Sequence, residues 1–380
     1  MQVLAVDIGT GTQDVFLLRA GLSLEDGFKL VLPSPTMIVR RQIQEATRRG
    51  EGIVLSGVTM GGGPCAWAAE AHRRAGLPLY ATPEAARTLN DDLEWVEREL
   101  GVVLVSEEEA ARLTGVQRLE MKDFDYFSLQ RAFELFGVKL EPSAVAVAVF
   151  DHGAAPPDIS DRTFRFDYLE QRLRQTGRLT AFAYRAAEIP PFLTRLRAVA
   201  ASGAGWPAPL VVMDTAPAAI LGAGLDPLVA SRPRRLIVNV GNFHALAFRL
   251  GPDSVEAVFE HHTGELTSER LEAYLVSLAD GTITRDEVFA DMGHGALVFD
   301  PRPLSLDEGP FGIAVTGPRR EKLARSRLRP YFAVPAGDMM SAGCFGLLLA
   351  TADLIPETRQ AIHAAVEGRH AANAPWDVDA

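Results

Sequence analysis

Cysteine is nearly absent from this 380-residue sequence, which contains only Cys65 and Cys344. Two isolated cysteines form neither a disulfide framework nor a metal-ligand cluster, and they fit a reducing compartment. Long apolar runs are also missing. No uninterrupted stretch of about 18 apolar residues, the length that spans a bilayer, occurs, and Asp7 interrupts the first apolar run early. We therefore expect a cytoplasmic protein without a membrane span or a secretory signal.

An excess of positive charge is lacking as well. The formal net charge is −11, which argues against nucleic acid or an anionic membrane surface as a partner. Hydrophobic residues make up 47% of the chain and charged residues 23%, the proportions of an ordinary globular protein. The length is sufficient for roughly two or three domains with a large buried core.

The N-terminal stretch 3–18 predicts a β-hairpin with polar chemistry at its turn. An apolar run ends on Asp7, and a second apolar run follows the turn at 15–18. The turn consists of Gly9, Thr10, Gly11 and Thr12. Glycines let backbone N–H groups approach phosphate oxygens, and an acid can hold hydrated Mg²⁺. An ordinary tight hairpin explains the same residues, and the stretch alone favours neither interpretation.

A second hairpin with the same order of features begins the other half of the chain. The apolar stretch 236–240 contains Asn239, the turn contains Gly241 and Asn242, and a further apolar run covers 245–250. The two hairpins lie about 230 residues apart. An internal repeat of this kind is stronger evidence than either hairpin alone.

A run of three glycines follows the strand expected at 53–60. Gly61, Gly62 and Gly63 precede Pro64, which is a favoured first residue of a helix, here expected at 65–75. A helix N-terminus behind glycines is a ready anion site, because its free N–H groups and its dipole attract negative charge. Close packing of a helix on a sheet also requires glycine, and both interpretations stay open.

Other segments complete the expected pattern. We expect a third strand at 29–39, a helical and charged region at 83–137, and a last helix at 338–352. The strand 145–150 leads into Asp151. The strand 210–213 ends on Asp214, which is either a catalytic base or the cap of the helix that follows.

Five of the eight histidines lie beside turns that follow apolar runs. They are His152, His244, His261, His262 and His294. A transition-metal site is one interpretation, although no local spacing such as H-x₃-H supports it. Proton transfer or phosphate contact is a second interpretation, and hydrogen-bonded structural histidines are a third.

Taken together, these motifs resemble those of the actin, sugar-kinase and heat-shock-protein ATPase superfamily. Residues 6–12 look like its first phosphate motif, and 237–242 occupy the place of its second. Residues 313–317 are similar to its adenosine motif, while 215–222 and 342–346 resemble its two connecting helices. The resemblance implies an α/β, ribonuclease H-like fold, the two-domain actin-like ATPase fold with duplicated hairpin-led halves.

The resemblance also implies a ligand, ATP with Mg²⁺, in the cleft between the domains. Asp7 would orient Mg²⁺, and the two glycine turns would hold the phosphates, with Thr316 and Gly317 beside the adenosine. Asp151 and Asp214 would act near an unidentified small-molecule or protein acceptor, together with the triple glycine and the histidines. The implied domains are 1–215, with an inserted subdomain at about 83–190, and 216–380. A homodimer is left open.

One departure weakens the case for hydrolysis. The second phosphate motif usually carries an acid, and Asn239 brings no negative charge to Mg²⁺. The main expectation is therefore a kinase or an ATPase, the first alternative a nucleotide-binding regulator without turnover, and the second a histidine-based metalloenzyme. More closely, the chain resembles a small family labelled as pyruvate formate-lyase activating enzymes. A radical-SAM activase needs three clustered cysteines, so we reject that chemistry.

Overall fold

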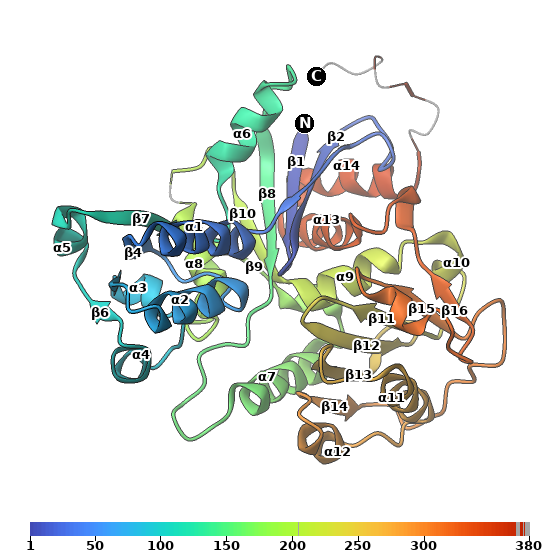
Figure 1. The fold of residues 1–380 in the computed structure, drawn as a ribbon. Coiled ribbons are helices and arrows are strands. Elements are labelled where there is room, and N and C mark those ends of the chain that lie inside the picture. Colours follow the sequence, from blue (N-terminus) through green and yellow to red (C-terminus); the bar gives the residue numbers. More distant parts are fainter. Residues whose placement is uncertain (204, 370–372, 375, 377–380) are drawn as a thin grey trace.

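The computed structural model describes residues 1–203, 205–369, 373–374 and 376. Two six-stranded sheets form the body of the molecule, and a four-stranded sheet projects from it (Figure 1). No helix among the described residues is long and apolar enough to cross a bilayer.

The first six-stranded sheet has the order β3-β2-β1-β8-β10-β9. Its strands are β1 (Gln2–Ile8), β2 (Thr12–Arg19), β3 (Phe28–Pro33), β8 (Pro142–Val149), β9 (Ala183–Arg185) and β10 (Leu210–Asp214). The first three strands form an antiparallel meander, and β8 and β10 continue the sheet in parallel with β1. The expected N-terminal hairpin is thereby confirmed.

The second six-stranded sheet, β14-β13-β12-β11-β15-β16, repeats this plan. Its strands are β11 (Arg235–Val240), β12 (His244–Leu250), β13 (Val255–His262), β14 (Gly295–Val298), β15 (Ile313–Thr316) and β16 (Pro330–Phe332). Again an antiparallel meander is extended by parallel strands on the side of its first strand. Two hairpin-led α/β halves of this topology are the two-domain actin-like ATPase fold that the sequence motifs implied.

The four-stranded sheet, β6-β5-β4-β7, is inserted between β3 and β8. Its strands are β4 (Gly52–Gly57), β5 (Leu79–Ala81), β6 (Val103–Leu104) and β7 (Val116–Met121), and all of its pairs are parallel. The helices between residues 34 and 135 are α1 (Pro35–Arg49), α2 (Pro64–Arg74), α3 (Pro83–Ala86), α4 (Leu93–Leu100), α5 (Glu107–Arg112) and α6 (Tyr126–Glu134).

The remaining helices cover the two large sheets. They are α7 (Asp161–Thr176), α8 (Thr194–Ser202), α9 (Thr215–Ala223), α10 (Pro227–Ala230), α11 (Ser268–Asp280), α12 (Arg285–Ala290), α13 (Ala342–Leu354) and α14 (Pro356–Val366). Short 3₁₀ turns occur at Leu179–Phe182, Ala186–Glu188, Arg320–Leu323 and Pro335–Gly337.

Helices α9 and α13 lie between the two large sheets and cross each other at backbone contact (Figure 1). A Cβ added to Gly222 would lie 1.6 Å from the carbonyl oxygen of Ala342, and one added to Gly346 would lie 1.9 Å from that of Ala218. Only glycine permits this approach. Both of the expected connecting helices are therefore confirmed, and their small residues set the distance between the halves.

Strand β8 shows how the sequence builds this core. Its alanines (Ala144, Ala146 and Ala148) face the cluster that contains α13, and its valines (Val145, Val147 and Val149) face the opposite cluster. Successive side chains of a strand point to opposite faces. The alanine face lets α13, which is buried along nearly its whole length, approach the sheet closely.

Three expected elements were wrong in extent or kind, and one helix was missed. The third strand ends at Pro33 instead of 39, because Ser34 and Pro35 begin α1 there. The region 83–137, expected to be helical, contains β7, which pairs with β4. Helix α7 was not expected. The helix expected to be the last begins at Ala342 and is followed by α14, which starts with Pro356.

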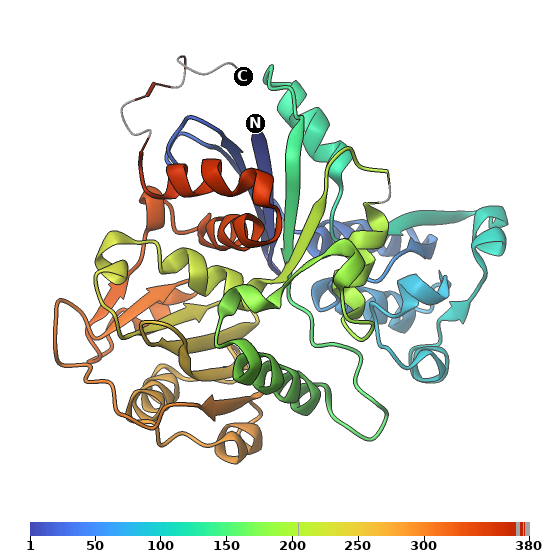
Figure 2. The same cartoon turned by 180° about the vertical axis from the view of Figure 1, so that it is seen from behind.

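The halves of the chain exchange elements in space. Helix α7 comes from the first half but packs beside β14, and α13 and α14 come from the second half but join the core of the first sheet (Figure 2). The expected division at residue 215 stays a proposal. We propose that α7 belongs to the second domain and that α13 and α14 belong to the first. We also propose that the inserted subdomain is the region that contains the four-stranded sheet of β4 to β7.

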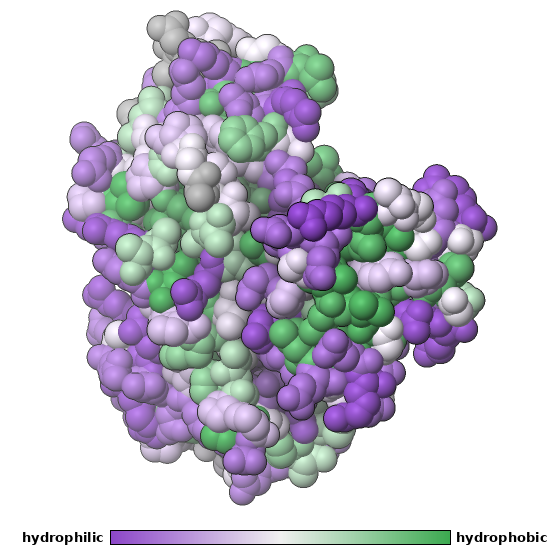
Figure 3. Space-filling model, turned by 90° about the vertical axis from the view of Figure 1, so that its left-hand side faces the viewer, coloured by the Kyte–Doolittle hydropathy of each residue, from purple (hydrophilic) through white to green (hydrophobic). Residues whose placement is uncertain are grey.

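The side of the molecule that carries the small sheet is largely polar. Figure 3 shows apolar side chains gathered among polar ones on the part that projects from the main body. Large apolar side chains with more than half of their surface exposed include Trp67, Phe127, Leu135 and Phe136.

Candidate functional site

The turns of the two hairpins close with the same backbone hydrogen bond. The Gly9 N–H donates to the Thr12 carbonyl at 2.9 Å, and the Gly241 N–H donates to the His244 carbonyl at 2.9 Å. Asp7 and Asn239 occupy the matching position, two residues before each glycine. The internal repeat expected from the sequence is therefore confirmed at the level of single hydrogen bonds.

The tips of these turns meet between the halves. A Cβ added to Gly11 would lie 2.7 Å from Nδ2 of Asn242, and Arg319 donates a hydrogen bond to Oδ1 of Asn242 at 3.1 Å. Beside them, Trp67 of α2 stacks on Phe243 of the second turn, with ring centroids 5.5 Å apart. The second hairpin thus contacts both the first hairpin and the small-sheet region.

A cavity of about 400 Å³ lies between the hairpins, within the range typical of small-molecule sites. Most of the expected site residues line it: Asp7, Gly9, Thr10, Thr12, Gly61, Gly62, Gly63, Asp151, His152, Asn239, Gly241, Asn242, His244, Thr316 and Gly317. Gly11, Asp214, His262 and His294 do not line it. Residues spread over some 310 positions of sequence are therefore brought to one cavity.

Two aspartates of the first hairpin face each other at this cavity. Asp7 on β1 pairs in register with Asp14 on β2, and the Thr215 hydroxyl donates to Asp7 at 2.6 Å. Burial raises the pKa of Asp7 to about 6. Burial and the nearby Asp7 and Asp338 charges raise the pKa of Asp14 to about 8. Because Oδ1 of Asp14 has no hydrogen-bond partner within the described chain, a cation would relieve both acids.

Glycines cover the polar residue of each hairpin. A Cβ added to Gly343 of α13 would lie 1.8 Å from Oδ2 of Asp7. A Cβ added to Gly317, which has a φ of 96°, would lie 2.3 Å from Oδ1 of Asn239. Any side chain at either position would displace the polar group.

The triple glycine is tightly packed. The Gly61 N–H donates to Asp123, the Thr36 hydroxyl donates to the Gly62 carbonyl at 2.6 Å, and a Cβ added to Gly62 would lie 2.5 Å from a carbonyl oxygen. Gly63 has a φ of 59° and faces Phe243. Close packing alone accounts for these glycines, so their part in anion binding stays a prediction.

Asp214 is the cap of the helix that follows it, one of the two alternatives from the sequence, and its part as a catalytic base stays a prediction. It caps α9 by accepting the Ala216 N–H at 2.9 Å, and it accepts a hydrogen bond from Arg165 at 2.6 Å. Arg165 is fully buried and also contacts Glu260 at 2.9 Å. Breaking such a buried network typically costs about 3–5 kcal/mol. The capping alternative is confirmed, and Asp214 is a structural partner of Arg165.

Asp151 lines the cavity, but both of its oxygens are engaged. They accept the backbone N–H groups of Gly153 at 2.8 Å and of Leu196 at 2.9 Å. Burial raises the pKa of Asp151 to about 6. The neighbouring Arg195 binds Asp123 through two nitrogens, at 2.7 and 3.0 Å. Asp151 therefore holds the loop after β8 in place, and its part in catalysis stays a prediction.

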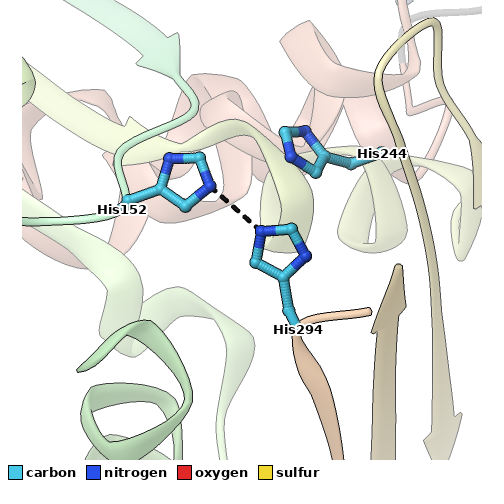
Figure 4. A group of neighbouring side chains, drawn as sticks. All are labelled: His152, His244 and His294. Atoms are coloured by element: carbon cyan, nitrogen blue, oxygen red, sulfur yellow. Dashed lines mark hydrogen bonds between the residues drawn. The ribbon is translucent and has the colours of Figure 1, made fainter. Parts of the chain in front are cut away.

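Four histidines gather beside the cavity, and two of them, His152 and His244, line it. Nε2 of His152 lies 3.1 Å from Nε2 of His294, and the His244 ring stacks on Phe150 with centroids 4.0 Å apart. Figure 4 shows His152, His244 and His294 converging from three separate segments. The His262 ring centroid lies 4.6 Å from that of His294. Burial lowers the pKa of His152 to about 3, and the pKa values of His244 and His294 are also lowered by burial.

His261 is a hydrogen-bonded structural histidine, which is the third interpretation that the sequence left open. Its ring contacts Tyr274 and hydrogen-bonds the carbonyl oxygens of His262 and Asp291. Adjacent residues of a strand point to opposite faces, so His261 lies in the core and His262 lies toward the cluster.

Several residues of the site were not expected from the sequence. They are Asp14, Asp123, Arg165, Arg195 and Glu260. The alternation of β2 could have placed Asp14 on the face of its register partner Asp7. No local signal distinguishes the buried Arg165 from the other arginines of the same helix.

Solved structures give only distant matches. The ROK hexokinase from Thermus thermophilus is 14% identical, with a TM-score of 0.28, and the match covers 93% of this chain and 100% of that chain. A ROK family transcriptional regulator, a homolog of the E. coli MLC protein, is 9% identical with a TM-score of 0.21, covering 67% and 37%. The Aquifex aeolicus PPX-GPPA enzyme is 11% identical with a TM-score of 0.18, covering 72% and 56%.

These TM-scores are too low to support an argument, and the fold rests on the sheet order. No curated protein matches the chain. One family matches residues 60–322, well over half of the chain, from the residue before the triple glycine to beyond the Thr316-Gly317 turn. The chain therefore belongs to the family described as "Putative pyruvate format-lyase activating enzyme (DUF1786)".

Proposed function

We propose that the cavity binds ATP with Mg²⁺ and that the chain is an ATP-dependent small-molecule kinase or an ATPase. The main support is the pair of matched glycine turns that face each other across one cavity, with two acids on one side only. Backbone N–H groups in glycine turns bind phosphate oxygens, and carboxylates hold hydrated Mg²⁺. Phosphoryl transfer requires mainly positioning and charge neutralisation.

The roles follow from the positions around the cavity. Asp7, with Asp14 beside it, would hold Mg²⁺ through water, and the turn 9–12 would bind the β- and γ-phosphates. Gly241 and Asn242 would contact the phosphates from the other half, with Gly317 beside the adenosine. The acceptor would lie near the triple glycine and Asp151, since these residues line the same cavity.

A nucleotide-binding regulator without turnover is the second candidate. Asn239 favours it, because this residue brings no charge to Mg²⁺ and cannot act as a base. Its cross-strand partner is Leu246, so no other acid of that hairpin substitutes for it.

The family description names an activating enzyme, and radical-SAM chemistry is not what these residues support. Such an enzyme holds its iron–sulfur cluster with three clustered cysteines. The two cysteines here are buried in different hydrophobic clusters, and burial raises the pKa of the Cys65 thiol to about 11. A cytoplasmic location and a homodimer stay predictions from the sequence.

Calorimetric titration with ATP and Mg²⁺, followed by an assay of ADP and phosphate release, tests the proposal. Binding with turnover supports the enzyme, and binding without turnover supports the regulator. Failure to bind any adenine nucleotide would overturn both candidates. Asp253→Asn changes an exposed acid of the turn between β12 and β13 that does not line the cavity, and it is the matched control for Asp7→Asn.

A further inference from the structure

Three imidazoles converge beside the cavity from distant parts of the chain. His152 follows β8, His244 begins β12, and His294 precedes β14. Ligand nitrogens of the three rings lie within 4.8 Å of one another, and the shortest pair is 3.1 Å apart (Figure 4). Nitrogens that share one tetrahedral Zn²⁺ at about 2.1 Å lie about 3.4 Å apart. Small ring movements would therefore bring all three to one ion.

Hydrogen bonds do not account for this arrangement. His152 and His294 can share one proton between their Nε2 atoms, but Nε2 of His244 and Nδ1 of His294 are buried and find no hydrogen-bond partner in the described part of the chain. An unsatisfied buried polar group destabilises the folded state. The unpartnered Nε2 of His244 is a donor that a bound ion would use, whereas the unpartnered Nδ1 of His294 lies toward Glu260.

The surroundings of His294 match those of a metal ligand. Nδ1 of His294 lies 3.7 Å from Oε1 of Glu260, whose carboxylate Arg165 fixes at 2.9 Å. A metal-binding histidine typically presents its other ring nitrogen to a carboxylate, which fixes the tautomer and increases ligand basicity. With the proton on Nδ1, the lone pair of Nε2 faces His152.

We propose that His152, His244 and His294 bind one divalent transition-metal ion of the Zn²⁺ class, with a fourth coordination position open to the cavity. Imidazole suits such ions, whereas Mg²⁺ prefers the oxygens of Asp7 and Asp14. His152 and His244 line the cavity and His294 lies behind them. Three protein ligands with one open position are typical of a catalytic site rather than a closed structural one.

The open position indicates what this part of the cavity receives. An ion there would bind water or an oxygen of the acceptor, such as a carboxylate or an alkoxide, and would hold it opposite the phosphate turns. The proposed metal site does not depend on the nucleotide proposal. Its three histidine ligands are different residues from Asp7 and Asp14, the two acids of the first hairpin.

The test uses the full chain purified without a chelator and without a polyhistidine tag. Elemental analysis should find about one transition-metal ion per chain. After metal removal, calorimetric titration with Zn²⁺ should give one site, and Co²⁺ should give the visible absorption of a four- or five-coordinate ion. Because a change to an outer partner of a metal ligand already costs about 10–100-fold in affinity, His152→Gln and His244→Gln should each weaken Zn²⁺ binding more than this.

His363 lies in α14, away from the three histidines of the proposed site. His363→Gln is therefore the matched control and should bind Zn²⁺ like the wild type. Thermal unfolding verifies that each variant is folded. His152→Gln, which changes a partly exposed loop residue, provides the test if the buried His294→Gln does not fold. Absence of Zn²⁺ binding by the wild type, or unchanged binding and an unchanged Co²⁺ spectrum in His152→Gln and His244→Gln, would overturn the proposal.

Discussion

The two hairpins have turns with the same backbone hydrogen bond, but only the first hairpin carries acids at its mouth. Each turn is closed by a glycine N–H bond of 2.9 Å. On the first hairpin the cross-strand pair at the mouth is Asp7 with Asp14, and on the second it is Asn239 with Leu246. The duplicated fold therefore supplies two turns with matching backbone geometry, while all of the hairpin acid lies on one side. A cation that bridges the halves would be held by the first hairpin alone.

Removal of the acid from the first hairpin should have the largest effect. Asp7→Asn keeps the shape and the hydrogen bond from Thr215 but removes the charge that would hold Mg²⁺. We expect a loss of about 100-fold or more in kcat/KM for ATP turnover, the usual size for one charge-stabilising group. Steady-state assays across a range of Mg²⁺ concentrations measure it.

The corresponding change on the other hairpin, Asn239→Ala, should cost much less, because this residue brings no charge. Equal losses for Asp7→Asn and Asn239→Ala would contradict the asymmetry. A regulator without turnover would show the same contrast in its affinity for Mg·ATP instead of its rate.

The covering glycines offer a second contrast. Gly343→Ala gains about 1 kcal/mol of helix propensity, but its Cβ would lie 1.8 Å from Asp7, and overpacking of this kind costs about 1–3 kcal/mol. We expect a lower melting temperature and a weaker Mg²⁺ dependence of binding. Gly317→Ala displaces Asn239 instead, so nucleotide affinity should fall while the Mg²⁺ dependence stays.

Gly264→Ala is the control for both substitutions, because no atom lies within 4 Å of the added Cβ. Thermal unfolding and calorimetry of the three variants give the comparison. Wild-type Mg²⁺ dependence in Gly343→Ala would show that Asp7 does not hold the ion.

The acid pair should also make stability depend on pH. The pKa of Asp14 is about 8 and that of Asp7 about 6, both raised from 3.8 by burial. The folded state then holds protons that the unfolded chain has released, so stability is highest below pH 4 for these groups and falls as pH rises through 8. Each 1 kcal/mol lost lowers Tm by about 2–4 °C.

Thermal unfolding between pH 5 and 9 should therefore show a falling Tm without Mg²⁺, and added Mg²⁺ should restore more stability at pH 8 than at pH 6. Asp14→Asn should flatten the profile, and the exposed Asp253→Asn should not. A rising Tm over this range in the wild type would contradict the shared burial of the two acids.

The sequence predicted the order of the main strands and helices because local sequence patterns encode these elements. Apolar runs, glycine turns and small-residue helices appear as continuous patterns, and both hairpins and both connecting helices were found from them. The inserted sheet was missed in part, since β6 has two residues and β7 alternates charged and apolar side chains on an exposed edge. Helix α7 was missed, and its buried Arg165 is paired with Glu260 and Asp214, which lie far away in sequence.

The site was predictable where one stretch carries the chemistry and not where distant residues share it. The glycine turns and Asp7 were recognised from single stretches and line the cavity. The role of Asp214 depended on Arg165, and the convergence of His152, His244 and His294 depended on three segments meeting. Side-chain direction decides such cases, and one sequence does not record it.

The smallest expected effect comes from making the second hairpin resemble the first. Asn239→Asp restores an acid at the matched position, where Oδ1 already lies against Gly317. If charge alone limits turnover, a gain of severalfold in kcat should appear, because the new carboxylate adds one ligand to Mg²⁺. The second hairpin offers no partner acid across the strand, so the substitution should not reproduce the pH profile of the Asp7–Asp14 pair. An unchanged kcat with tighter Mg·ATP binding would favour the regulator. A site that carries an acid on both hairpins and still does not turn over ATP acts in nucleotide sensing and not in catalysis.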